Sequence, residues 1–245
     1  MYSPDKKGSY SRELIRNTPV DTSSQFFEHC KRFIKKFPDE AFYVYSFEKH
    51  QMLYTHGWEE LVGIPDDQIG MVDIVNLTAP DFAPFVEEVN DKALMFLMVR
   101  SDELVDYCFQ IHIKLRHVSG KEIPISAKVA VYDTFEDGRL RSISGAFRLN
   151  DSLRFGKVMR MSSYGPKKRE FENALDPELF KQLIITEKEA EALKLAADGL
   201  TDKEIADQIG ISIHSVDKRF RSIRKRFSCR SRTELLSFAF DNYLL

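Results

Sequence analysis

The chain has 245 residues, 43% of them hydrophobic and 30% charged, with a formal net charge of −2 at pH 7. Such a composition suits a globular chain long enough for two domains and excludes the disordered and fibrous classes. The longest apolar run, Ala93 to Val99, is far shorter than the roughly 20 residues that cross a bilayer, so neither a transmembrane helix nor a membrane partner is expected. Three cysteines stand far apart without a C-x-x-C pair, which argues against a disulfide framework and favours a reducing cytoplasm.

The N-terminal part begins with a segment that has charges but no apolar core. Residues 1–23 are therefore expected to form a flexible leader, not a secretory signal. Residues 24–36 then predict an amphipathic helix that Pro38 ends. Its expected apolar side comprises Phe26, Phe27, Cys30, Phe33 and Ile34.

Strands follow this helix. Residues 41–47 and 50–56 flank a polar turn and predict a hairpin, and residues 57–69 predict short helical turns. A longer helix is expected around residues 84–99. From Tyr107 to Leu149 apolar and polar residues alternate around two glycine-containing turns, which predicts three antiparallel strands with one buried face.

The next segment, residues 151–182, mixes basic residues, glycine and prolines. This composition predicts a linker, with some helix over residues 171–182. Its basic side chains are expected to be solvated.

Two capping boxes open the C-terminal part. Thr186 and Glu189 form a T-x-x-E box before a helix that Gly199 ends, and Thr201 and Glu204 repeat the box before a second helix that ends at Gly210. A third helix is expected to start at the N-cap Ser212, and a fourth, apolar helix follows Ser231.

The third helix carries six basic side chains between Lys218 and Arg226. Apolar residues at spacings of three and four predict a buried stripe, with the basic residues on the outer face. Two short helices joined by a tight glycine-containing turn, the second basic outside, have the features of a helix-turn-helix. A solvated helix face is the plain alternative. The stripe comprises Ile213, Val216, Phe220, Ile223 and Phe227.

Several linked motifs carry a family resemblance for about 60 residues: the T-x-x-E opening, "KEIA", "IS-x-x-[ST]V" and a closing R-x-E. Residues 183–245 resemble the LuxR-type, or GerE-type, DNA-binding domain. The resemblance implies an all-α four-helix domain whose third helix enters the major groove of duplex DNA, and whose fourth helix mediates dimerisation. Asp217 and Arg219 depart from the family pattern, where a lysine and a histidine are usual, so the base preference is expected to differ.

Side chains near the start of the third helix are the expected base or nearby phosphate contacts, and later ones grip the DNA backbone. Asp217 either accepts from a cytosine amino group or pairs with Arg221 four residues on; we expect the pair. The second helix adds phosphate contacts at its N-terminus. The candidate DNA-binding residues are Thr201, Lys203, His214, Ser215, Asp217, Lys218, Arg221, Arg224 and Lys225.

Residues 24–150, with two strands, helices and three strands, resemble a PAS domain, a small sensory module. The resemblance implies an α+β fold, an antiparallel sheet with helices, that senses a signal or dimerises. A flavin-type reactive cysteine motif is missing, and the helical part lacks a histidine for haem. His112 and His117 point to opposite faces of a strand, so no metal site is expected. No cofactor is evident, and a small-molecule ligand is left open.

No phosphate-binding loop or nucleophile elbow emerges, so we expect no enzyme. The sequence predicts a cytoplasmic, homodimeric transcription regulator that binds duplex DNA, with RNA polymerase as a second candidate partner. The alternative is a protein-interaction scaffold whose basic helix contacts RNA polymerase or RNA.

Overall fold

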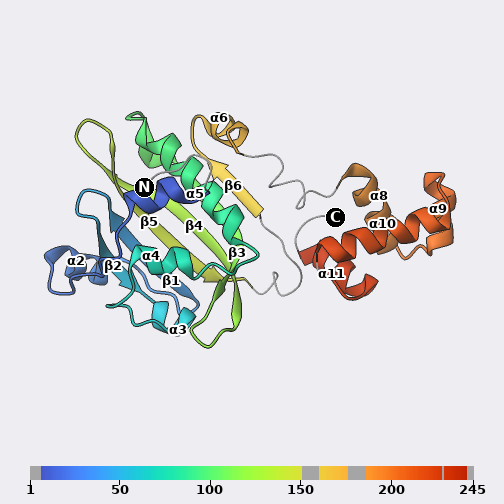
Figure 1. The fold of residues 1–245 in the computed structure, drawn as a ribbon, viewed down its shortest axis with the longest axis horizontal. Helices are drawn as coiled ribbons and strands as arrows, with labels where there is room; N and C mark the ends of the chain where they lie inside the picture. Colours follow the sequence, from blue (N-terminus) through green and yellow to red (C-terminus); the bar gives the residue numbers. More distant parts are fainter. Residues whose placement is uncertain (1–6, 151–159, 176–185, 228, 242–245) are drawn as a thin grey trace. The chain divides into compact units, whose positions relative to one another are not determined.

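The computed structural model describes residues 7–150, 160–175, 186–227 and 229–241 (Figure 1). The chain divides into two compact units, which are described separately. We call residues 1–149 and 159–176 the sheet unit, and residues 150–158 and 177–245 the helical unit. Among the described residues, no helix is long and apolar enough to span a membrane.

The sheet unit is built on six antiparallel strands in the order β2-β1-β5-β4-β3-β6 (Figure 1). The predicted hairpin and three-stranded meander are confirmed. Phe109, Ile111, Ile113 and Leu115 alternate with more exposed neighbours and are buried on one face, because successive side chains of a strand point to opposite faces. The strands are β1 Glu40–Ser46, β2 Gln51–His56, β3 Cys108–Arg116, β4 Glu122–Thr134, β5 Leu140–Leu149 and β6 Arg160–Tyr164.

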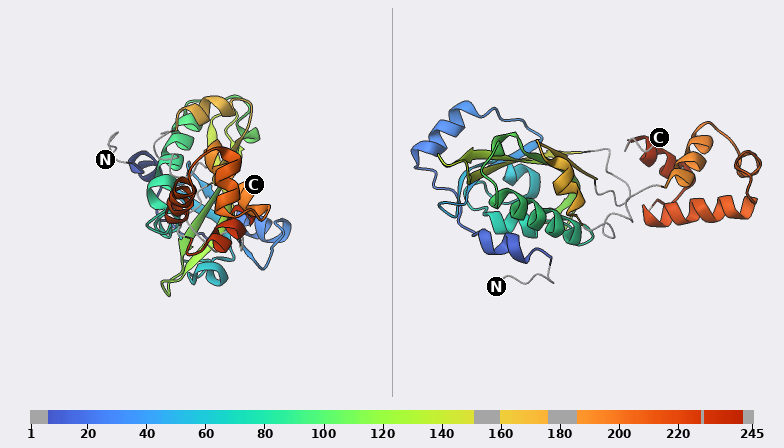
Figure 2. Two further views of the ribbon diagram at one scale, coloured as in Figure 1. Left: turned by 90° about the vertical axis from the view of Figure 1, so that its right-hand side faces the viewer. Right: turned by 90° about the horizontal axis from the view of Figure 1, so that it is seen from above.

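Helices lie on both sides of this sheet (Figure 2). Between β2 and β3 the chain forms α3 Trp58–Val62, α4 Met71–Asn76, α5 Ala83–Met98 and the 3-10 turn η1 Leu104–Asp106. Helices α4 and α5 cover the buried face, while α2 Gln25–Phe33 packs over the other face, where Cys30 lies in a cluster with Val44 and Tyr54. An antiparallel sheet in this strand order, with helices inserted between β2 and β3, confirms the predicted PAS-like α+β fold.

The prediction of a flexible leader is wrong for residues 9–14. They form α1 Ser9–Leu14, which lies against α5: the Ser11 backbone N–H donates to the buried Asp91 carboxylate at 2.7 Å. The buried residues of α1 are Ser9 and Ser11, so no apolar pattern marked this helix in the sequence.

The linker prediction also needs correction. Residues Arg160–Tyr164 form β6, which extends the sheet beyond β3, and Lys168–Asn173 form α6, somewhat earlier than the helix expected over 171–182. A five-residue edge strand of mostly polar residues gives no periodic signal. Residues 176–182 of the predicted helix lie outside the described residues.

One residue of α2 does not pack as expected. Phe33 was expected on the apolar side, but 67% of it is exposed. It is the last residue of α2, and its ring lies 4.6 Å from the ring of exposed His29, not against the sheet.

The helical unit has the four predicted helices: α8 Glu187–Ala197, α9 Asp202–Ile209, α10 Ile213–Arg226 and α11 Arg232–Asp241. Each contributes to one apolar core, which includes Leu193, Ile205, Phe220 and Phe238. The predicted all-α architecture of this part is confirmed.

Candidate nucleic-acid interface

Both predicted capping boxes are formed. Glu189 Oε2 accepts from the Thr186 backbone N–H at 2.9 Å, and the Thr186 hydroxyl accepts from the Glu189 N–H at 3.3 Å. Thr201 and Glu204 make the same reciprocal pair. These bonds satisfy backbone groups that a helix start leaves free, and so they fix where α8 and α9 begin.

Helix α10 starts directly after a tight turn. Gly210 ends α9 with a φ of 68°, and the Ser212 hydroxyl accepts from the Ser215 N–H at 3.1 Å as an N-cap. The apolar stripe is buried at Val216, Phe220, Ile223 and Phe227. Ile213 is an exception, since 51% of it is exposed. At 100° per residue it lies at the edge of the stripe, and as the first residue of α10 it stands at the end of the helix.

The opposite side of α10 carries one exposed stripe of polar and basic side chains. His214, Lys218, Arg221 and Lys225 are all exposed and follow one another at spacings of four, three and four, which align them along one line of the helix. Ser215 and Ser222 flank this line and are exposed as well. We call these six residues the α10 stripe.

The predicted Asp217–Arg221 ion pair is present. Arg221 Nη2 lies 2.5 Å from Asp217 Oδ2, and 70% of the Arg221 side chain and 39% of the Asp217 side chain are exposed. Such an exposed pair contributes little to stability, about 0.5 kcal/mol. It instead holds the guanidinium of Arg221 against the flank of the helix.

Other basic residues of this region are bonded within the helical unit. Arg219 donates to the Lys188 carbonyl at 2.8 Å, and Arg226 donates to Glu189 Oε2 at 2.9 Å, so both tie α10 to α8. Arg232 bonds to Asp202 of α9 and lies over the ring of Phe220. Sequence reasoning missed these roles, because charge alone does not reveal which residue a side chain meets in the fold.

Glu189 takes part in two interactions, the capping box with Thr186 and the ion pair with Arg226. Burial alone would raise the pKa of this carboxyl, but the hydrogen bonds from Arg226 and Thr186 outweigh burial and hold the pKa below its ordinary value. Glu189 is therefore a carboxylate that both caps α8 and holds α10.

Arg224 differs from the other predicted backbone contacts. It is half-buried and donates to the Arg230 carbonyl at 3.3 Å, while its Nε is buried and has no hydrogen-bond partner among the described residues. Its guanidinium is thus partly used within the helical unit.

The two predicted contacts on α9 lie at its start. Thr201 and Lys203 are both exposed, but the Thr201 hydroxyl is already used in the capping box. At this end of α9, Lys203 and the N-terminal backbone N–H groups are available to bind a phosphate. No group of three potential metal ligands occurs within the described ranges.

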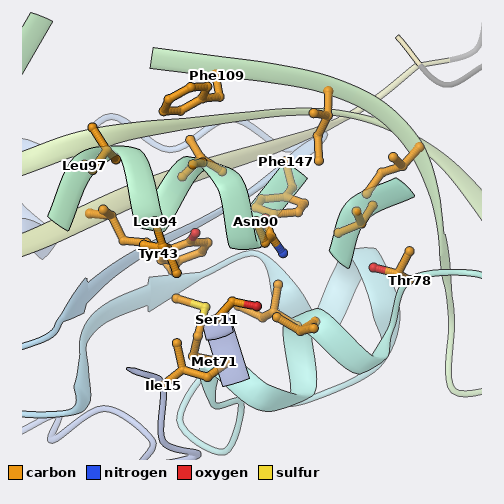
Figure 3. A pocket seen from close by; sticks show the side chains of 18 of the residues that line it. Ser11, Ile15, Tyr43, Met71, Thr78, Asn90, Leu94, Leu97, Phe109 and Phe147 are labelled. Atoms are coloured by element: carbon orange, nitrogen blue, oxygen red, sulfur yellow. The ribbon is translucent and has the colours of Figure 1, made fainter. Parts of the chain in front are cut away.

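The sheet unit contains an apolar cavity between the sheet and helices α1, α4 and α5 (Figure 3). Its empty volume is about 780 Å³, part of it open to solvent. The wall is aliphatic and aromatic except for four polar side chains, and none of the lining side chains is charged. The polar ones are Ser11, Tyr43, Thr78 and Asn90.

Comparison with known proteins places the helical unit in a family. The model of the family described as bacterial regulatory proteins, luxR family, matches residues 183–239. A probable transcriptional regulator ycf29 of Porphyra purpurea is 36% identical over 74 residues, which are 30% of this chain and 35% of that protein. The ycf29 of Guillardia theta is 36% identical over 59 residues, 24% of this chain and 28% of that protein. The chain thus spans about a third of the curated relatives it matches.

Solved structures show a weaker likeness. The Vibrio cholerae VqmA dimer, described as a LuxR-type receptor, is 15% identical with a TM-score of 0.34, over 90% of this chain and 89% of that chain. A PAS domain from Colwellia psychrerythraea is 16% identical with a TM-score of 0.35, over 50% of this chain and 93% of that chain. Similarity this low says nothing of function. The family match and the four packed helices agree on one conclusion: this chain carries, at residues 183–239, a domain of the luxR family of bacterial regulatory proteins.

Proposed function

We propose that the protein is a sequence-specific transcription regulator that binds duplex DNA through α10, with residues 183–245 as its DNA-binding domain. The observation that carries this proposal is the α10 stripe, an exposed line of basic and hydroxyl side chains on a helix whose other side is fixed in an apolar core. A rigid helix with this outer face fits the major groove.

The side chains divide into two roles. Near the start of α10, His214, Ser215 and Lys218 are exposed and can reach base edges, while Arg221 and Lys225 neutralise phosphates further along. Lys203 and the N-terminal N–H groups of α9 add a contact to the DNA phosphates, while Thr201 is held in its capping box. Arg224 contributes only by exchanging its bond to the Arg230 carbonyl for a phosphate.

Asp217 has a separate role in this scheme. Its carboxylate pairs with Arg221, so it sets the direction in which that guanidinium points. If DNA draws Arg221 to a phosphate, Asp217 is released to accept from a base amino group.

We further propose that the protein acts in the cytoplasm as a homodimer. Two copies of α10 would then enter successive major grooves about 34 Å apart on an inverted repeat. Free Cys30, Cys108 and Cys229 are consistent with a reducing compartment.

The cavity of the sheet unit supports a sensory role for the PAS-like domain. Its wall is almost entirely aliphatic and aromatic with a few polar groups, the kind of lining that small-molecule sites have. Burial raises the pKa of the Tyr43 phenol, which keeps it neutral, so the whole wall is uncharged. An ion there would lose its hydration without gaining a partner. The cavity therefore suits an uncharged, mainly apolar molecule.

Selection from a random duplex library tests the DNA-binding proposal. We expect independent selections with the full-length protein to enrich the same sequence. An unlabelled duplex of that sequence should then displace the labelled duplex from the protein, whereas RNA should not. If single-stranded or structured RNA competes better than any duplex, the alternative of an RNA-contacting scaffold is favoured and the proposal is wrong.

A further inference from the structure

Helix α6, which follows β6 near the end of the sheet unit, packs onto the domain through one buried aromatic ring. Phe171 of α6 is 1% exposed, and its ring lies 4.7 Å from the ring of Phe109 in β3 and 5.7 Å from the ring of Phe96 in α5. Both contacts are edge-on, the geometry that aromatic pairs favour. Phe171 thus closes the core at the edge of the sheet.

The Phe109 side chain contributes both to the wall of the cavity and to the packing of α6. It lines the cavity, and it also holds Phe171. In Figure 3 Phe109 lies on one side of the cavity, with Ile15 and Met71 on the opposite side. Val129 is paired with Phe109 across β3 and β4 and lines the same wall. A molecule in the cavity that displaces this wall therefore also displaces the Phe109 ring against which α6 packs.

Polar contacts complete the docking. Glu170 pairs with Arg100 at 2.5 Å, and the Arg100 guanidinium lies 3.6 Å from the centroid of the Phe96 ring. The Ser163 hydroxyl donates to Glu172 at 2.7 Å, and Lys167 pairs with Asp102 at 3.0 Å. Most of these groups are exposed, so the apolar contact of Phe171 supplies most of the docking energy.

Helix α6 has only six residues. Isolated helices shorter than about 12–15 residues are marginal in water, so α6 is helical because Phe171 is seated. Undocking and melting are then one event, an order–disorder change of the kind that proteins use as switches.

The position of α6 in the chain gives this event a consequence. It is the last described helix before the capped start of α8 at Thr186, which opens the helical unit. When α6 is docked, the sheet unit holds the chain to Leu175. When α6 is released, the chain is held only by β6, and a melted residue spans up to about 3.5 Å against 1.5 Å in a helix.

We propose that α6 is a latch that reports the state of the cavity: an occupant that displaces the Phe109 ring unseats Phe171, melts α6 and lengthens the connection to the DNA-binding domain. The regulatory meaning of the latch rests on the proposed function. The latch itself rests only on the shared contact at Phe109.

The test uses full-length protein and replaces the unknown occupant by a side chain. Val129→Phe adds bulk beside Phe109, Ile15→Phe adds bulk on the far side of the cavity, and Phe171→Ala removes the latch directly. Lys168→Ala, on the exposed side of α6, is the surface control. Hydrogen exchange is followed at the amides of Phe171, Ala174 and Leu175, which bond within α6 and its end.

We expect exchange at these amides to be at least 10-fold faster in Val129→Phe and in Phe171→Ala, and unchanged in Ile15→Phe and Lys168→Ala, with β3 and β5 still protected in all four. Unchanged exchange in Val129→Phe, with the sheet intact, would overturn the latch. Equal loosening by Ile15→Phe would overturn it too, because bulk anywhere in the cavity would then have the same effect. If Val129→Phe loses protection throughout the sheet, Val129→Leu takes its place under the same criteria.

DNA affinity separates the latch from the function it serves. We expect Val129→Phe and Phe171→Ala to change the affinity for the selected duplex by the same factor, at least threefold, and the double variant to show no further change. Equal affinity in all variants would contradict a regulatory latch. If the unaltered protein binds no duplex, the proposed function fails, while the exchange experiment still decides whether the latch exists.

Discussion

Glu189 and its partners show how single residues divide the basic region of the helical unit into structural and exposed groups. The Arg226 and Glu189 side chains are 21% and 12% exposed, and their ion pair joins α10 to α8. We expect Arg226→Ala to destabilise the helical unit by about 2 kcal/mol, the typical value for a hydrogen bond to a charged group. Lys225→Ala, one position earlier and fully in the α10 stripe, is expected to change stability by less than about 0.5 kcal/mol.

Urea unfolding followed by far-ultraviolet circular dichroism measures this difference. Trp58, the chain's single tryptophan, lies in the sheet unit and provides an internal control by fluorescence. The unfolding midpoint of the sheet unit, followed by Trp58 fluorescence, is expected to be the same in both variants. Equal stability of Arg226→Ala and Lys225→Ala would mean that Arg226 does not position α10.

The same carboxylate makes the helical unit sensitive to acid. The folded-state pKa of Glu189 lies below the ordinary value of 4.5, because its hydrogen bonds from Arg226 and Thr186 outweigh its burial. A depressed carboxyl pKa contributes stability that is complete above the unfolded pKa and is lost as pH falls through the folded pKa. We expect Glu189→Gln to flatten the loss of helical-unit stability below about pH 4.5, measured by thermal melts across that range; an unchanged profile would assign the acid sensitivity to another group.

At the scale of elements, helix termination is set by backbone conformation. Gly210 ends α9 with a φ of 68°, and an added Cβ would meet nothing within 4 Å. Gly210→Ala therefore costs only the backbone strain of a left-handed residue, about 1 kcal/mol. Gly210→Asn is expected to cost less, because asparagine tolerates this conformation. Thermal unfolding of the two variants checks the order, and an alanine variant as stable as asparagine would contradict it.

The elements that could be predicted are those whose sequence carries local signals. The paired capping boxes at Thr186 and Thr201 marked α8 and α9, and alternation marked β3 to β5. Helix α1 and strand β6 were missed, and α6 was expected too late in the chain, because these elements are short and largely polar and distant partners such as Asp91 and Phe109 stabilise them. The candidate site followed the same rule: the spacing predicted the exposed line of α10, but the bonds of Arg219, Arg226 and Arg232 depend on residues of other helices.

For the whole molecule, the proposed domain division predicts that residues 183–245 fold without the sheet unit. Their core is drawn from α8 to α11 and neighbouring turns. A fragment of this length has a small core and modest stability. We expect helical circular dichroism with a cooperative melt, and duplex binding at least 10-fold weaker than that of the full chain, because the fragment keeps α11 but lacks the PAS-like domain, the other part that could hold the proposed homodimer together. An unfolded fragment would contradict the proposed boundary.

The salt dependence of duplex binding tests most directly the central claim that the α10 stripe contacts DNA. Fluorescence anisotropy with the selected duplex compares the unaltered protein with a variant carrying Lys218→Ala, Arg221→Ala and Lys225→Ala, and with the control Lys194→Ala on α8. Each lost phosphate contact is expected to flatten the slope of log affinity against log salt by roughly 0.9 per bound protomer. A weakened triple variant with a flatter slope, beside an unchanged control, is the predicted result; a triple variant with the affinity and slope of the unaltered protein would place DNA binding elsewhere on the molecule.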